Sequence, residues 1–107
     1  MLSWEAIIEL MYDKHLDAFT NEVIEVIYSK DRSMRYVVLK ENNGLLTYQL
    51  EAIYQFDEDE WRYICSSDNV LPAMWEPFRG IVGKSFYKSM EELRKGIENE
   101  PEFKQYF

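Results

Sequence analysis

The stretch from Val23 to Cys65, VIEVIYSKDRSMRYVVLKENNGLLTYQLEAIYQFDEDEWRYIC, decides the fold. It contains four short segments rich in β-branched and aromatic residues, which favour strands, and polar turns separate these segments. The predicted strands are about 22–29, 35–40, 45–56 and 61–65. The predicted turns are 31–33, the hairpin signal Asn42-Asn43-Gly44, and the acidic run 57–60. Because consecutive strands joined by short turns pair as neighbours, we expect an antiparallel meander.

Helical patterns flank this stretch. Ser3 can cap a first helix whose apolar residues recur every three or four positions, a spacing that places them on one face. Towards the other end, Ser89 and Glu92 form a capping box that opens a second helix, and Pro101 suits the first turn of a short terminal helix. We therefore expect an α+β fold in a single domain spanning residues 1–107. It consists of a four-stranded antiparallel meander sheet covered on one face by the N-terminal and the C-terminal helix.

The net charge is strongly negative. The 107 residues include 20 acids and 12 bases, which gives a formal net charge of −8. A surface of that sign repels phosphate backbones and anionic lipids, so it argues against nucleic-acid binding and against membrane binding. The charge favours a basic protein partner. The alternative is that the acids only keep a small protein in solution.

The number of cysteines and the hydropathy of the chain indicate its cellular compartment. Cys65 is the only cysteine, so no disulfide can form within the chain, as is usual in a reducing compartment. No run of apolar residues approaches the roughly 20 that are needed to cross a bilayer. The first residues lack the basic start and the cleavage site of a secretory signal. We therefore expect a cytoplasmic protein.

No pattern of reactive residues predicts catalysis, a cofactor or a bound metal. The segment 80–85, GIVGKS, ends like a phosphate-binding loop, but two residues separate its glycines where the motif needs four, so it predicts a turn. His15 and Cys65 are each the only residue of their type, which is too few donors for a structural zinc site. The acidic run 57–60 lacks the ligand spacing of a calcium loop and fits a solvated hairpin tip. We expect no enzyme activity.

The segment 70–79, VLPAMWEPFR, is the candidate interaction surface. It combines tryptophan, phenylalanine, methionine and arginine, which are typical of binding hot spots, in a stretch that two prolines keep irregular. The predicted partner-binding residues are Met74, Trp75, Glu76, Phe78 and Arg79. The alternative interpretation is that Leu71, Trp75 and Phe78 fold back and fill an open edge of the core.

Three hypotheses for the function follow. The leading one is a non-enzymatic module that binds another protein through the segment 70–79. In its sharpest form it is an immunity-like or antitoxin-like protein acting on a basic partner. In size and acidity the chain is similar to bacterial toxin-immunity proteins, and its ending from Gly83 to Phe107 resembles the tails of small bacterial proteins. This resemblance implies a bacterial source and brings no catalytic residue.

The second hypothesis is a small-ligand-binding or enzymatic domain with a site between the sheet and the helices. Its predicted polar lining is Tyr48, Glu51, Tyr54 and Tyr63. The third hypothesis is a homodimer that forms through an exposed strand edge.

Overall fold

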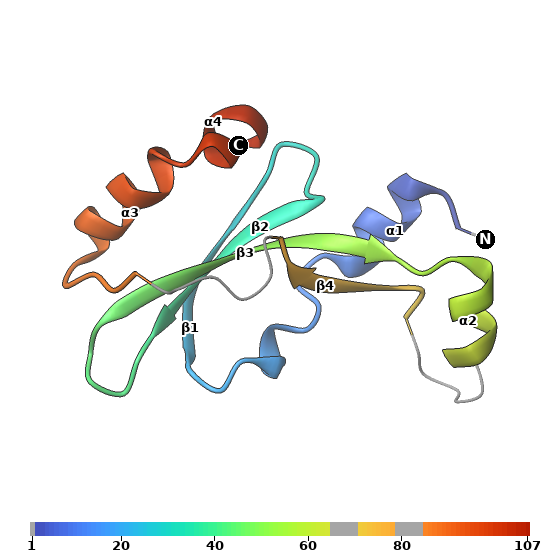
Figure 1. Cartoon of the computed structure of the whole chain (residues 1–107), viewed down its shortest axis with the longest axis horizontal. Helices are drawn as coiled ribbons and strands as arrows, with labels where there is room; N and C mark the ends of the chain where they lie inside the picture. Colours follow the sequence, from blue (N-terminus) through green and yellow to red (C-terminus); the bar gives the residue numbers. More distant parts are fainter. Residues whose placement is uncertain (1, 65–70, 79–84) are drawn as a thin grey trace.

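Figure 1 shows the computed structural model of the chain, which describes residues 2–64, 71–78 and 85–107. In chain order its elements are α1 (Trp4–Met11), the 3-10 helix η1 (Leu16–Ala18), β1 (Glu22–Tyr28), β2 (Met34–Lys40), β3 (Leu46–Gln55), α2 (Glu58–Ile64), β4 (Ala73–Pro77), α3 (Met90–Glu98) and α4 (Pro101–Tyr106). The strands form one sheet in the order β1-β2-β3-β4, and each neighbouring pair is antiparallel. The predicted α+β class and the four-stranded meander are therefore confirmed.

The turn between β2 and β3 forms at the predicted hairpin signal, 42–44. Gly44 has a φ of +85°, a conformation that glycine adopts without steric cost. Its N–H donates to the carbonyl of Glu41 at 2.9 Å, and the N–H of Leu45 donates to the side chain of Asn43 at 3.0 Å. These local bonds set the register of the β2–β3 pair.

The fourth strand does not lie where the sequence pattern placed it. The predicted strand at 61–65 is wrong, because Glu58–Ile64 form α2, and Cys65 lies outside the described residues. β4 comes instead from the segment that was predicted to be irregular, with Pro77 at its last position. Proline is tolerated there because β4 is an edge strand, whose outer side needs no ladder hydrogen bonds.

A capping box explains why α2 begins where it does. The Asp57 carboxylate accepts from the N–H of Glu60 at 2.8 Å, and the Glu60 carboxylate accepts from the N–H of Asp57 at 3.2 Å. This reciprocal pair satisfies amide donors at the helix start, which have no partner within the helix. The acidic run 57–60 therefore leads into the first turn of a helix and is not the predicted hairpin tip.

The helices divide between the two faces of the sheet. The face formed by Tyr36 and Val38 of β2 packs against α3 and α4. The opposite face, formed by Ile53 of β3 and Trp75 of β4, packs against α1. The sequence-based expectation placed both helices on one face. The difference follows from β2, which is buried along both faces and so needs cover on each side.

The α1 side of the sheet encloses an unusual charge. Arg35 of β2 is fully buried, and its Nε donates to the Glu51 carboxylate at 2.8 Å. The guanidinium carbon lies 4.1 Å from the centroid of the Trp75 ring. Its two terminal nitrogens have no hydrogen-bond partner among the described residues, so the Trp75 ring and Glu51 together stabilise the charge.

Replacing Glu51 by alanine should lower the free energy of unfolding by about 3–5 kcal/mol, because it leaves the Arg35 charge buried without its anion. The double variant Arg35→Met with Glu51→Leu should recover most of that loss, because apolar side chains of similar volume need no ion partner. Urea unfolding followed by circular dichroism measures both. A double variant no more stable than Glu51→Ala would show that the loss comes from packing and not from the unpaired charge.

Candidate functional site

The structure separates the predicted partner-binding residues between the core and the surface. Trp75 is 5% exposed and belongs to the core beside α1, so for this residue the core-filling interpretation holds. Met74 and Phe78 are 39% and 43% exposed, and Glu76 is half-buried. Arg79 lies outside the described residues. The surface part of the predicted set is therefore smaller than the sequence suggested.

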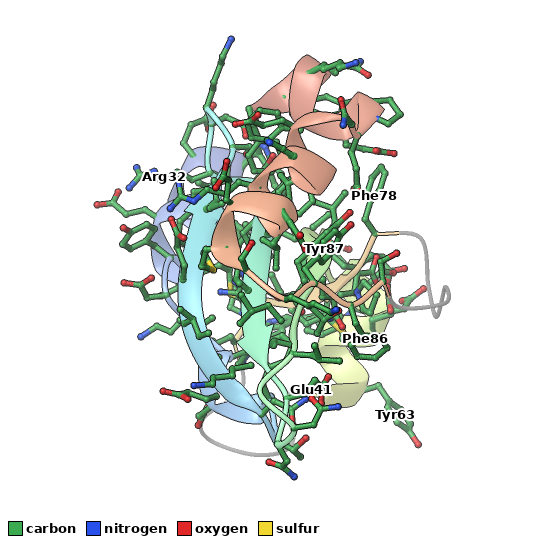
Figure 2. The ribbon with its side chains drawn as sticks, turned by 90° about the vertical axis from the view of Figure 1, so that its left-hand side faces the viewer. Arg32, Glu41, Tyr63, Phe78, Phe86 and Tyr87 are labelled. Carbon is green, nitrogen blue, oxygen red and sulfur yellow. The ribbon has the colours of Figure 1, made fainter. Side chains whose placement is uncertain are left out.

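Met74 and Phe78 belong to an apolar patch that also includes β3. Met74 lies directly opposite Tyr54, whose side chain is 38% exposed. Because alternate residues of an extended chain share a face, Phe78 points to the same side as Met74. Figure 2 shows Phe78 on the side of the sheet that carries α3. We refer to Tyr54, Met74 and Phe78 as the β3–β4 patch.

Acidic side chains surround Tyr54. Its hydroxyl donates to the Glu60 carboxylate at 2.6 Å. This hydrogen bond is the main cause that raises the pKa of Tyr54 to about 12, and the negative charges of Asp57 and Glu76 act in the same direction. Glu76 stands on β4 within the patch itself. The patch therefore has an acidic rim at its Tyr54 end, formed by Asp57 and Glu60, and Glu76 lies between Met74 and Phe78 on the same face.

An apolar pocket adjoins the patch at the end of the sheet, and we call it the end pocket. It has a volume of about 370 Å³ and is lined by Leu2, Gln55, Phe56, Trp61 and Pro72. Its lining residues belong to the N-terminal segment, the end of β3, α2 and the segment before β4, and Figure 1 shows the N-terminus, the tip of β3 and α2 at the right of the view. Phe56 joins the pocket to the patch, because its ring meets that of Tyr54 edge-on with 5.8 Å between centroids.

The residues predicted to line a ligand site between the sheet and the helices do not converge. Tyr48 and Glu51 are three positions apart on β3 and so lie on opposite faces of the sheet. Tyr54 belongs to the β3–β4 patch. Tyr63 of α2 is 87% exposed and points away from the body of the molecule in Figure 2. These four side chains share no pocket in the described part of the chain.

Tyr48 instead attaches the C-terminal helices to the sheet. The hydroxyls of Tyr36 and Tyr48 donate to the two carboxylate oxygens of Glu100, at 3.1 and 2.8 Å, at the start of α4. Burial raises the pKa of Tyr48 far above its ordinary value, and the hydrogen bond to Glu100 raises it further. The Tyr87 ring stacks on that of Tyr48 with 6.0 Å between centroids. This cluster therefore holds the C-terminal helices against the sheet.

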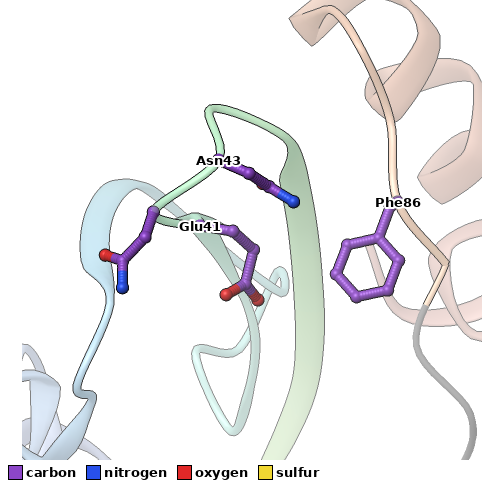
Figure 3. Close-up of a pocket in the computed structure, with 4 residues that line it drawn as sticks. Glu41, Asn43 and Phe86 are labelled. Atoms are coloured by element: carbon purple, nitrogen blue, oxygen red, sulfur yellow. The ribbon is translucent and has the colours of Figure 1, made fainter.

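Two further hollows are less suited to a ligand. One lies between the β2–β3 hairpin and the segment before α3, and its lining residues are Glu41, Asn42, Asn43 and Phe86. It is open, three of its four lining residues are polar, and the Phe86 ring faces the hairpin across it (Figure 3). The other is a groove of about 170 Å³ between β1 and α3, where Arg94 Nη2 donates to both Glu25 carboxylate oxygens, at 3.0 and 2.9 Å. That ion pair occupies two of the three charged side chains that line the groove, and Glu98 is the third.

The described residues contain neither a cluster of metal ligands nor a membrane-spanning helix. Within 2–64, 71–78 and 85–107, no three side chains among the histidines, cysteines and acids come together to hold a metal ion. No helix in this part of the chain combines the length and the apolar character needed to span a membrane. The segment that resembles a phosphate-binding loop lies outside this part, apart from Ser85. Comparisons with protein-family models, with curated proteins and with solved structures found no match to this chain.

The sequence-based interpretation missed Phe56 and Trp61, which line the end pocket. The spacing of Asp57 and Glu60 was the available signal, because a capping box begins a helix directly before Trp61. On a strand, Trp61 and Tyr63 would share a face. On a helix, residues two apart point in nearly opposite directions, and the structure accordingly places Trp61 in the pocket and Tyr63 in solvent.

Replacing Glu60 by glutamine should lower the pKa of Tyr54 from about 12 towards the ordinary tyrosine value of about 10. The negative charge of Glu60 disfavours the phenolate, and glutamine removes that charge while it can still cap α2. An alkaline NMR titration of ¹³C-labelled tyrosine measures the midpoint. The control is Glu58→Gln, which removes an acid of the same run that does not bond Tyr54. Equal shifts in the two variants would contradict the assigned hydrogen bond.

Proposed function

We propose that this chain is a non-enzymatic protein-binding module that recognises a basic protein partner through the β3–β4 patch. The observation that carries the proposal is the exposure of three large apolar side chains, Tyr54, Met74 and Phe78, on one strand pair. Exposed apolar side chains that gather in a patch are typical of interaction surfaces, whereas single ones need no explanation. Aromatic residues and methionine are also enriched at protein interfaces.

The charge around the patch supports a basic partner. Glu76 stands within the patch, and Asp57 and Glu60 lie close enough to Tyr54 to raise its pKa. The chain as a whole carries a net charge of −8. Carboxylates beside apolar contact residues select a partner of opposite charge and accelerate the encounter.

The backbone that carries the patch is held by the sheet. Tyr54 and Met74 are paired across antiparallel strands, and the N–H of Phe78, directly after β4, donates to the carbonyl of Leu50 at 2.9 Å. Trp75 holds β4 in place from the other face of the sheet. A backbone that is already held in place loses little conformational freedom when a partner binds.

In its sharpest form, the proposal is an immunity-like or antitoxin-like protein of the bacterial cytoplasm. Such a protein acts by occupying one partner and needs no catalytic group of its own. The single cysteine, Cys65, agrees with a reducing compartment. The basic partner that the acidic rim favours would be the protein that this chain neutralises.

The two other hypotheses have less support from the described residues. The proposed polar lining of a ligand site is spread over both faces of the sheet. A homodimer through a strand edge is discouraged by an irregularity in β1 between Val23 and Glu25, and by Pro77 at the end of the short strand β4. Bulges and prolines on edge strands oppose edge-to-edge pairing.

Replacing Met74 and Phe78 together by aspartate should weaken partner binding at least about 30-fold, because it puts two charges at apolar positions of the interface. The partner is first captured from the native host with the unmodified chain, identified by mass spectrometry and purified. Isothermal titration calorimetry then compares its affinity for the unmodified chain and for the double variant. Affinity for the unmodified chain should fall as salt concentration rises.

The matched control for this experiment is Phe86→Asp, which changes a ring of similar exposure at the β2–β3 hairpin. It should bind the partner as the unmodified chain does. Circular dichroism checks that each variant is folded. Trp75→Ala is unsuitable here, because Trp75 is buried and its loss would destabilise the core. Equal affinities of the double variant and the unmodified chain would refute the proposal.

A further inference from the structure

We propose that the end pocket receives the apolar anchor side chain of a basic segment of the partner. This inference rests on the proposed function and names the chemistry of the segment that would bind: an aromatic or branched apolar residue with lysine or arginine on either side. Four observations support it, which are the size of the pocket, its lining, the acidic chain next to it and its continuity with the β3–β4 patch.

The size and lining of the pocket suit a bulky side chain. Its volume of about 370 Å³ is at the small end of the range for ligand sites, which begins near about 300 Å³. The rings of Phe56 and Trp61 form its walls, together with Leu2 and Pro72, and Gln55 adds one amide that can bond to a peptide backbone. Aromatic walls with one polar side chain among the described lining residues favour an aromatic or branched apolar occupant.

The chain next to the pocket is acidic. Four acids, 57–60, connect the two aromatic walls Phe56 and Trp61, and one base, Arg62, follows them. Glu58 and Asp59 are exposed and form no ion pair with any other described residue. A basic group beside the anchor residue would therefore meet carboxylates that are free to pair, and would gain both affinity and encounter rate.

The apolar surface continues from the pocket onto the patch. Phe56 lines the pocket and contacts Tyr54 of the patch, and Pro72 lines the pocket two residues before Met74. A free small molecule in the pocket would leave the patch uncovered. A peptide segment can fill the pocket with one side chain and cover the patch with the next, so the observations favour a protein segment as the occupant.

Three short peptides test this inference on the whole chain. All are acetylated and amidated: Ala-Lys-Trp-Lys-Ala, its acidic counterpart Ala-Glu-Trp-Glu-Ala, and Ala-Lys-Ala-Lys-Ala, which lacks the anchor. N-acetyltryptophanamide serves as the free small-molecule arm. Each is titrated into ¹⁵N-labelled protein and followed by amide chemical shifts. We expect Ala-Lys-Trp-Lys-Ala to shift the amides of Leu2, Gln55 and Trp61, with an affinity at least about tenfold above that of each other probe.

Two variants distinguish binding in the pocket from nonspecific association with the protein surface. Leu2→Lys adds a positive charge to the lining of the pocket at an exposed position, so it should not unfold the protein. It should lower the affinity for the basic peptide at least about tenfold. Trp61→Ala should do the same by removing a wall. Phe86→Ala, far from the pocket, should change nothing. Absent shifts at the pocket amides, equal binding of the acidic peptide, or equal binding of N-acetyltryptophanamide would each overturn the inference.

The outcomes for the pocket and for the proposed function are distinguishable. Peptide binding at the pocket together with unchanged partner affinity of the Met74 and Phe78 double variant would refute the proposed interface at the patch and leave the pocket standing. Loss of partner binding in that double variant, with no peptide shifts at the pocket, would refute the pocket alone.

Discussion

The stacking of Arg35 on Trp75 is the interaction on which the rest of the structure depends. Trp75 lies with its ring centroid 4.1 Å from the guanidinium carbon, and its indole N–H donates to the carbonyl of Met11 at 2.9 Å. One side chain therefore joins β4 to β2 and to the end of α1. The Arg35 charge is fully buried, with Glu51 as its anion, so the same ring also shields a charge that would be costly to leave uncompensated.

The buried position of Trp75 also decides what the surface presents. Side chains alternate along β4, so when Trp75 points into the core beside α1, Met74 and Glu76 must point to the other face. That face is covered by α3 and α4 only over the other end of the sheet, which leaves the β3–β4 patch exposed. The capped start of α2 then brings Glu60 to Tyr54 and completes the acidic rim. The candidate site is thus a consequence of how the core is packed.

The sequence-based prediction was most accurate for elements that depend on interactions between residues close together in the chain. The hairpin at 42–44 was predicted correctly, because it depends on one glycine with positive φ and on bonds between near neighbours. The prediction of a strand at 61–65 was wrong. That segment alternates like a strand, but Asp57 and Glu60 cap the start of a helix that continues to Ile64. The strand at 73–77 was missed, because Pro72 before it and Pro77 at its end argue against a central strand, and nothing local shows that it lies at an edge.

The sequence by itself determined the first three strands with their turns, the helix that Ser89 caps and the short helix that Pro101 begins, because turn and helix-start chemistry acts over three or four residues. Only the tertiary structure decided which segment became β4, how the helices divide between the faces, and which residues of 70–79 are buried. Those outcomes depend on contacts between residues far apart in the chain, such as Trp75 with Arg35 and Tyr54 with Met74. No local pattern encodes such contacts, because their energy is gained only when the whole sheet has formed.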